Sequence, residues 1–149
     1  MRIVIVGGVA AGMSAAARAR RLDESAEIIV LERGEHVSFA NCGLPYYVGG
    51  EIEQQSSLLV QTPASLRAAL NLDVRVNTEA VGLDAGAKIL TLRTAAGEER
   101  LEYDALILAP GAFALHPPIA GLDSPRVHTL RTVADAVTLR QMVEDGAKK

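Results

Sequence analysis

Cys42 is the only cysteine among the 149 residues, and it lies in a polar stretch, residues 38–46, that also contains glycine and proline. A cysteine thiolate can pass an electron pair to or from a disulfide. Because no second cysteine is present, that disulfide has to form with a small thiol, and a persulfide or a sulfenic acid fits the same single sulfur. The alternative is a buried structural cysteine. The polar loop around Cys42 favours the redox interpretation.

A second candidate site is the segment GGVAAG, residues 7–12, between an apolar run and an alanine-rich stretch. A strand, a glycine loop and a helix in this order direct backbone N–H groups and the helix dipole at a pyrophosphate. Glu32 lies twenty positions after Gly12 (32 minus 12), where an acidic side chain can accept hydrogen bonds from a ribose. Val9 departs from the G-x-G-x-x-G pattern, so a corner with glycines for packing alone is the alternative. The loop predicts dinucleotide binding without choosing between NAD and FAD.

A third candidate is polar and basic. Ser14, Arg18 and Arg21 are spaced by four and by three residues, which places a hydroxyl and two guanidinium groups on one face of a helix. Guanidinium groups pair with anionic groups in general. A solvated basic helix face is an equally good interpretation of the arginines.

Buried strands and a helix are predicted to hold these residues. Residues 2–6 (RIVIV) and 27–32 (EIIVLE) have the apolar composition of buried parallel strands, and residues 10–22 favour a helix between them. This is one βαβ unit. Residues 33–57 are rich in Gly, Pro, Ser and Asn and contain Cys42, so we predict an irregular functional loop there.

The second half of the chain completes the predicted sheet. Thr62 and Pro63 begin a helix that extends to about Leu70. An antiparallel meander is predicted next, from short strands separated by turn residues: 73–77, 80–84, 88–94 and 98–102. Residues 103–109 form another buried strand, and residues 132–144 form a helix. The predicted fold class is α/β, a parallel sheet with flanking helices and an inserted antiparallel meander.

The composition excludes several classes of function. A formal net charge of -3, 3% aromatic residues and no Trp argue against nucleic-acid binding and against attraction to an anionic membrane. His36, His116 and His128 have no metal-ligand spacing, so no metal is expected. The apolar run after Arg2 resembles a signal peptide, but its glycines favour a strand, turn and helix. A single cysteine suits a reducing compartment, so we expect a cytoplasmic protein.

Five segments carry a specific resemblance: SFANCGLPY at 38–46, GGVAAG at 7–12, LILAPGA at 106–112, PPIAGLD at 117–123 and VHTLRTVADA at 127–136. Together they resemble the FAD-dependent pyridine nucleotide-disulfide oxidoreductases, in particular the coenzyme A-disulfide reductases and the related NADH oxidases and persulfide reductases. The resemblance covers essentially the whole chain. It implies the FAD/NAD(P)-binding fold, with FAD as the cofactor and NAD(P)H as the electron donor.

The resemblance also implies roles for residues. Cys42 is the expected catalytic residue. The residues expected around the cofactor are Gly7, Val9, Ala10, Ala11, Gly12, Glu32, Arg33, Asn41, Cys42, Val81, Ala109, Pro110, Gly111 and Arg131. Those expected to bind coenzyme A are Ser14, Arg18, Arg21, Ser38 and Asn41.

In that family NAD(P)H reduces FAD, and the flavin reduces a mixed disulfide on the cysteine. Residues 1–149 are expected to be the amino-terminal part of the FAD-binding domain, without the NAD(P)H-binding and dimerisation domains. The full-length protein is expected to be a homodimer acting on coenzyme A disulfide or a related small disulfide or persulfide, and the fragment alone is expected to be inactive. Two alternatives stay open: an NADH oxidase that reduces oxygen through flavin and a cysteine sulfenic acid, and a non-catalytic nucleotide-binding module.

Overall fold

The computed structural model describes residues 1–146, which fall into two compact units. The first consists of Met1–Ser38 and Gln61–Gly111, and the second of Phe39–Val60 with the chain from Ala112 onward. The chain crosses between them on either side of the cysteine segment, so the glycine loop and Cys42 belong to different units.

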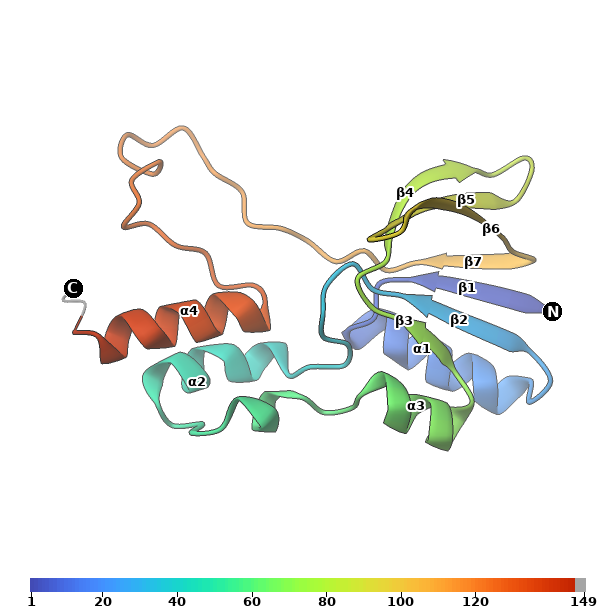
Figure 1. Cartoon of the computed structure of the whole chain (residues 1–149), viewed down its shortest axis with the longest axis horizontal. Helices are drawn as coiled ribbons and strands as arrows, with labels where there is room; N and C mark the ends of the chain where they lie inside the picture. The colour runs from blue at the N-terminus through green and yellow to red at the C-terminus, as the bar shows by residue number, and fades with distance from the viewer. Residues whose placement is uncertain (147–149) are drawn as a thin grey trace. The chain divides into compact units, whose positions relative to one another are not determined.

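The first unit contains a four-stranded parallel sheet (Figure 1). Its strands lie in the order β3 (Asp73–Arg75), β2 (Glu27–Leu31), β1 (Arg2–Val6) and β7 (Ala105–Leu108). The predicted buried strands are confirmed for β1 and β2, whose apolar residues are largely buried because this part of the parallel sheet is covered on both faces. The buried strand predicted at residues 103–109 is wrong in its burial: β7 is an edge strand of four residues that are at most partly buried, and Leu108 is 59% exposed.

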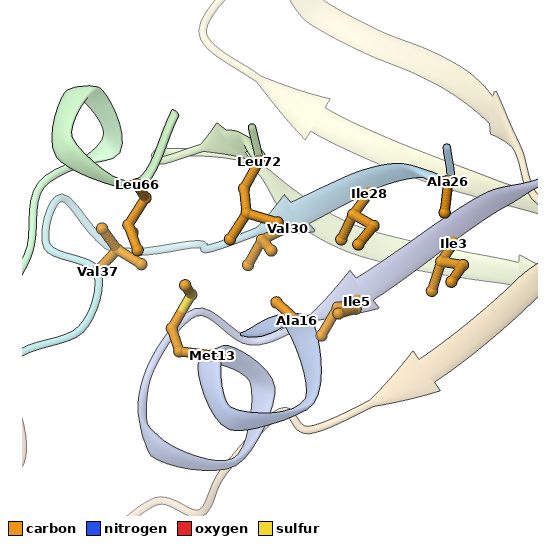
Figure 2. Packing of buried hydrophobic residues seen from close by; sticks show 10 residues of the cluster. All are labelled: Ile3, Ile5, Met13, Ala16, Ala26, Ile28, Val30, Val37, Leu66 and Leu72. Atoms are coloured by element: carbon orange, nitrogen blue, oxygen red, sulfur yellow. The ribbon is translucent and has the colours of Figure 1, made fainter. Parts of the chain in front are cut away.

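Alternate residues of β1 and β2 face the two sides of this sheet. Ile3 and Ile5 lie in one hydrophobic cluster, whereas Val4 between them lies in another. The first cluster packs under α1 (Ala10–Leu22) and α3 (Pro63–Leu70), and Figure 2 shows Met13 of α1 and Leu66 of α3 beside the sheet residues. This packing places the beginning of α1 directly after the carboxyl end of β1.

A three-stranded antiparallel sheet covers the other face. Its strands are β4 (Glu79–Asp84), β5 (Ile89–Thr94) and β6 (Gly97–Glu102), in that order. Its buried leucines pack against the second cluster of the parallel sheet: Leu90, Leu92 and Leu101. Figure 1 shows this layer on the face opposite α1 and α3.

The predicted meander is therefore correct for its last three strands and wrong for the first. Residues 73–75 form β3, which pairs in parallel with β2: Ile29 is opposite Asp73 and Leu31 is opposite Arg75. The physical reason is the preceding helix. α3 packs on the sheet with α1 and returns the chain parallel to β2, as the helix of a crossover connection does.

In the second unit, two helices pack side by side: α2 (Leu44–Gly49) and α4 (Val133–Glu144) (Figure 1). Short 3₁₀ helices lie at Asn41–Gly43 and Gln55–Leu58. Their shared core contains five buried residues: Leu44, Tyr47, Leu58, Val133 and Ala136.

The prediction that residues 33–57 are irregular is thus wrong for α2. Pro45 stands near the start of this helix, where a missing N–H costs nothing, and Gly50 ends it in a left-handed conformation. Leu44 and Tyr47 are three residues apart and share the buried face. Among residues 1–146, no helix is long and apolar enough to cross a membrane.

Candidate functional site

The glycine loop brings the ends of two strands and a helix into close contact. Gly7 has a φ of +104°, and a Cβ there would lie 1.9 Å from the carbonyl oxygen of Ala109. A Cβ on Gly12 would lie 1.7 Å from the carbonyl oxygen of Gly7. Both glycines are therefore required by the fold, and the backbone at Ala109 lies directly against the loop. Packing and phosphate binding are compatible roles, because the same lack of side chains exposes the backbone.

The amino terminus of α1 offers uncapped backbone N–H groups. Val9 occupies the N-cap position and cannot cap with its side chain, and the first turn contains no acidic residue. The amides of Ala10, Ala11 and Gly12 precede the first intrahelical bond, which runs from Met13 N to the Val9 oxygen at 3.0 Å. A helix of 13 residues that begins in this way suits an anionic group.

Glu32 fastens the glycine loop. Its Oε2 accepts a hydrogen bond of 2.8 Å from the backbone N–H of Gly8, and its Oε1 accepts one of 2.8 Å from Gly34. The carbonyl oxygen of Gly8 in turn accepts from Ser38 N at 2.8 Å. Gly8 was absent from the predicted cofactor residues. The pair of adjacent glycines was the available signal, but the bond to Glu32 depends on the pairing of β1 with β2.

A small cavity of about 90 Å³ lies at the carboxyl ends of β1 and β2. Four of the predicted cofactor residues line it: Gly7, Glu32, Arg33 and Pro110. Thr78, Glu79 and Ala80 line it as well and were not predicted. Val81, which was predicted, does not line it and is 37% exposed. The cavity is much smaller than the roughly 300–1,000 Å³ of a complete ligand pocket, so it suits one part of a larger ligand.

Thr78 is the buried one of the three additional residues. Its Oγ1 donates to the Val76 oxygen at 3.0 Å, and its backbone N–H donates to the Glu32 oxygen at 3.0 Å. The sequence signal was available only through β3: once residues 73–75 are a parallel strand, the residues that follow lie at the carboxyl edge of the sheet, where ligands bind.

Cys42 is exposed and stands in the 3₁₀ turn Asn41–Gly43. Gly43 N donates to the Ala40 oxygen at 3.0 Å, and Leu44 N donates to the Asn41 oxygen, so the turn continues into α2. Gly43 is buried, and a Cβ there would lie 3.0 Å from Leu58. The exposed thiol contradicts the alternative of a buried structural cysteine.

Two polar residues flank the cysteine. Asn41 has a buried Oδ1 for which no hydrogen-bond partner exists among residues 1–146. A buried acceptor without a donor is costly, so such an atom is typical of a site completed by a ligand. Ser38 has a φ of 50°, in the left-handed region that few non-glycine residues occupy. Ser38 belongs to the first unit and Asn41 to the second.

The predicted basic face of the first helix is present. Ser14, Arg18 and Arg21 are all exposed, whereas Arg20 between them is buried and donates to backbone oxygens. Both interpretations of the face remain open on this geometry, since exposed arginines serve a solvated surface and a phosphate site equally.

Arg131 makes a hydrogen bond to the segment that follows Pro110 and Gly111. Its Nε donates to the Ala112 oxygen at 3.0 Å, and its backbone N–H donates to Asp135 Oδ2 at 2.9 Å. Over the part of the chain that the structure describes, no cluster of three His, Cys, Asp or Glu side chains could hold a metal ion.

Known proteins are similar to this chain in sequence and in fold. The family model of pyridine nucleotide-disulphide oxidoreductases matches residues 1–147. Coenzyme A disulfide reductase of Staphylococcus haemolyticus is 33% identical over 99% of this chain and 33% of its own length. NADH oxidase of Methanocaldococcus jannaschii is 31% identical over 100% of this chain and 34% of its own length.

Solved structures agree. The reduced Bacillus anthracis CoADR-RHD has a TM-score of 0.92 with 45% identity, covering 97% of this chain and 26% of that one. A NAD-dependent persulfide reductase from A. fulgidus has a TM-score of 0.93 with 39% identity, and the match covers 99% of this chain and 28% of that one. This chain thus spans about a third of the length of the curated relatives that it matches. The relatives are oxidoreductases of an FAD-dependent family, and two of the solved neighbours are bound to NADPH or NADH. The match over residues 1–147 shows that the chain belongs to the pyridine nucleotide-disulphide oxidoreductase family.

Proposed function

We propose that residues 1–149 supply the amino-terminal part of the FAD-binding domain of an NAD(P)H-dependent disulfide reductase whose redox residue is Cys42. The observation that carries the proposal is the exposed Cys42, the chain's single cysteine, in a turn followed by a packed helix. Its acceptor is coenzyme A disulfide or a related disulfide or persulfide. The names of the relatives support this class of acceptor.

The first unit fits the adenosine and pyrophosphate end of FAD. The amides of Ala10, Ala11 and Gly12 would bind the pyrophosphate, and Glu32 would accept hydrogen bonds from the ribose hydroxyls. Both Glu32 oxygens already accept one backbone bond, but a carboxylate offers about four acceptor positions, so it can serve the loop and a ribose together. FAD, when bound, supplies the electron pair that restores the cysteine thiolate.

Cys42 would act as a nucleophile. Its thiolate attacks one sulfur of the substrate disulfide, a bond forms between Cys42 Sγ and that sulfur, the original S–S bond breaks, and the other sulfur leaves as a thiolate. Two electrons then cleave the mixed disulfide and release the second thiol. The exposed position of Cys42 supports this step, because a substrate disulfide has to reach the thiol.

Coenzyme A carries phosphates and amide groups, and each unit, taken by itself, offers polar residues that suit such groups. Arg18 and Arg21 would bind phosphates, with Ser14 on the same face. The free Oδ1 of Asn41 would accept a hydrogen bond from a ligand N–H or O–H. Ser38, with its constrained backbone, would contribute its hydroxyl.

A second candidate function uses the same thiol. In an NADH oxidase, Cys42 would cycle through a sulfenic acid during oxygen reduction, and an exposed single cysteine fits this chemistry as well. The NADH oxidase among the relatives favours it. For the whole protein we expect a homodimer in the cytoplasm with either acceptor.

The test uses a protein of the relatives' length that begins with this sequence. Under anaerobic conditions, NADH and NADPH are supplied in turn with coenzyme A disulfide, and thiol release is measured; oxygen consumption is measured separately. Thiol release that is at least tenfold faster than oxygen reduction supports the reductase, and the reverse supports the oxidase. Arg18→Gln with Arg21→Gln should raise the KM for coenzyme A disulfide at least fivefold, and the exposed Arg67→Gln on α3 is the control. If the protein shows neither activity and binds no flavin, the only function left is that of a non-catalytic nucleotide-binding module.

A further inference from the structure

Arg140 of α4 connects that helix to the end of α2. Its Nη1 donates to two backbone oxygens, that of Tyr47 at 3.1 Å and that of Ile52 at 2.8 Å. The centre of its guanidinium group lies 4.8 Å from the centroid of the Tyr47 ring. Its Nε donates to Glu144 Oε1 at 2.8 Å. An arginine in this position is held on three sides, and only 20% of its side chain is exposed.

These contacts complete the carboxyl end of α2. The Tyr46 oxygen accepts from Glu51 N at 2.9 Å, and the Tyr47 oxygen accepts from Gly50 N at 3.2 Å. Arg140 adds a charged donor to the Tyr47 oxygen and supplies a donor to the Ile52 oxygen. Hydrogen bonds to charged groups are the strong ones, so Arg140 fixes where α2 ends against α4.

The opposite end of α2 is the cysteine turn. Residues 40–44 are joined by the bonds Gly43 N to the Ala40 oxygen and Leu44 N to the Asn41 oxygen. The turn and α2 therefore form one continuous helical segment of nine residues, 41–49. A shift of α2 along α4 has to move Cys42, because a hydrogen-bonded helical segment moves as a unit.

Packing alone does not prevent α2 from shifting along α4. α2 contributes two buried side chains to the contact, Leu44 and Tyr47, against Val133 and Ala136 of α4. Val133 and Ala136 are small, and a helix of six residues has little intrinsic stability. The directional bonds of Arg140 are what select one position.

We propose that Arg140 is a positioning residue for the redox cysteine: by tying the end of α2 to α4, it fixes the orientation of the Cys42 thiol for attack on a disulfide. The inference rests on the proposed role of Cys42. It adds a residue that lies 98 positions along the chain (140 minus 42) and that no signal in the cysteine segment indicates.

The test measures the thiol directly in the 149-residue chain. Cys42 is the only cysteine, so the second-order rate constant of its reaction with a small chromogenic disulfide can be followed without interference. It is measured from pH 6 to 10 in the folded chain and in urea, and the ratio of the folded to the unfolded plateau rate constant is compared among wild type, Arg140→Lys and Arg140→Ala. Thermal unfolding of each variant is recorded so that only folded protein is compared.

In wild type the ratio should differ from one by at least fivefold. Arg140→Ala should move it at least threefold toward one, and Arg140→Lys, which keeps a charged donor, should lie between them. Arg20→Lys is the matched control, since Arg20 ties α1 to the end of α3 within the first unit and should lower the unfolding temperature without changing the ratio.

A wild-type ratio less than fivefold away from one would overturn the proposal, and so would an Arg140→Ala ratio less than threefold closer to one than that of wild type. If Arg140→Ala is too unstable to assay, Arg140→Lys decides: its ratio has to lie measurably closer to one than that of wild type, and a ratio equal to that of wild type overturns the proposal. Failure of the proposed function is distinguishable, because it is decided by thiol release from Cys42→Ser in the flavoprotein and not by this rate constant.

Discussion

The carboxylate of Glu32 accepts a hydrogen bond of 2.8 Å from the backbone N–H of Gly8, in the loop that is proposed to bind the pyrophosphate. A second bond, from Gly34, engages the other oxygen. Glu32 therefore holds the loop in shape before any ligand arrives. A preorganised loop loses less conformational freedom on binding, so the residue supports affinity through both the protein and the ligand.

Glu32→Ala should lower both stability and FAD affinity. Loss of two charge-assisted bonds should reduce the free energy of unfolding by about 2 kcal/mol or more. Glu32→Gln keeps one carbonyl acceptor and should lose about half as much. Urea denaturation of the chain gives the first quantity, and flavin titration of the longer protein gives the second. Glu35→Ala, an exposed neighbour, is the control. If Glu32→Ala lowers the free energy of unfolding but leaves the FAD affinity unchanged, Glu32 stabilises the loop and does not contact FAD.

Alanine at Gly12 should be severely destabilising. The added methyl group would lie 1.7 Å from the Gly7 carbonyl oxygen, which is backbone and cannot move aside without separating α1 from β1. We expect a loss of about 3 kcal/mol or more, or insoluble protein. Gly49→Ala is the matched control, because a Cβ at Gly49 meets nothing within 4 Å. Equal unfolding midpoints for the two variants would show that the loop can relax around a side chain.

Arg20 should matter more for stability than the exposed arginines of the same helix. Its guanidinium donates to backbone oxygens of two other segments, Leu70 at 2.8 Å and Glu24 at 2.7 Å among them. Arg20→Ala leaves these oxygens without the donor and should lower the free energy of unfolding by about 2–4 kcal/mol. Arg18→Ala, on the exposed face, should change it by less than about 0.5 kcal/mol. Denaturant midpoints measured in parallel decide between them.

Lowering the pH should destabilise the start of α4, because it protonates the Asp135 carboxylate. Partial burial raises the pKa of this carboxyl, but hydrogen bonds that its Oδ2 accepts from the backbone of Thr132 and Arg131, at 2.8 and 2.9 Å, outweigh burial and hold the pKa below its usual value. A lowered pKa in the folded state contributes stability above the unfolded value of about 3.9 and loses it as the pH falls through the folded value.

The expected result for Asp135→Asn follows from that sign. The variant should be less stable than wild type at pH 7, and the difference should shrink as the pH falls from about 5 toward 2. Denaturation at four or five pH values checks it. A difference that stays constant or widens in acid would mean that the ionised carboxylate does not stabilise the cap.

Local patterns were enough to predict the first βαβ unit, because the apolar runs of β1 and β2 and the loop GGVAAG act within about thirty residues. The partner of residues 73–75 was not predictable in this way: three residues of mixed polarity carry no periodicity, and their place beside β2 comes from the packing of α3. α2 was missed for a related reason. It is six residues long and includes a proline, in a segment that otherwise has the composition of a loop.

Some residues of the candidate site were likewise predictable from local patterns, and others depend on the fold. Gly7, Gly12, Glu32 and Cys42 are visible because their residue types stand in recognisable order. Thr78, Glu79 and Ala80 line the cavity only because β3 ends beside β2, and the Gly8 bond to Glu32 exists only because two strands pair in register. Arg140 is the extreme case, since its bonds to α2 and to the residues after it go to the backbone oxygens of Tyr47 and Ile52, and any sequence would offer such oxygens.

If Cys42 carries the electrons to the substrate, Cys42→Ser in the longer flavoprotein should abolish thiol release without affecting flavin reduction. The substitution nearly conserves side-chain volume and replaces an oxidisable thiolate with a hydroxyl that cannot form a disulfide. The measurement is anaerobic stopped-flow reduction of the bound flavin by NAD(P)H, followed by addition of coenzyme A disulfide, with thiol release recorded separately. For the serine variant we expect flavin reduction at the wild-type rate and thiol release at the background rate. Thiol release at the wild-type rate would contradict it.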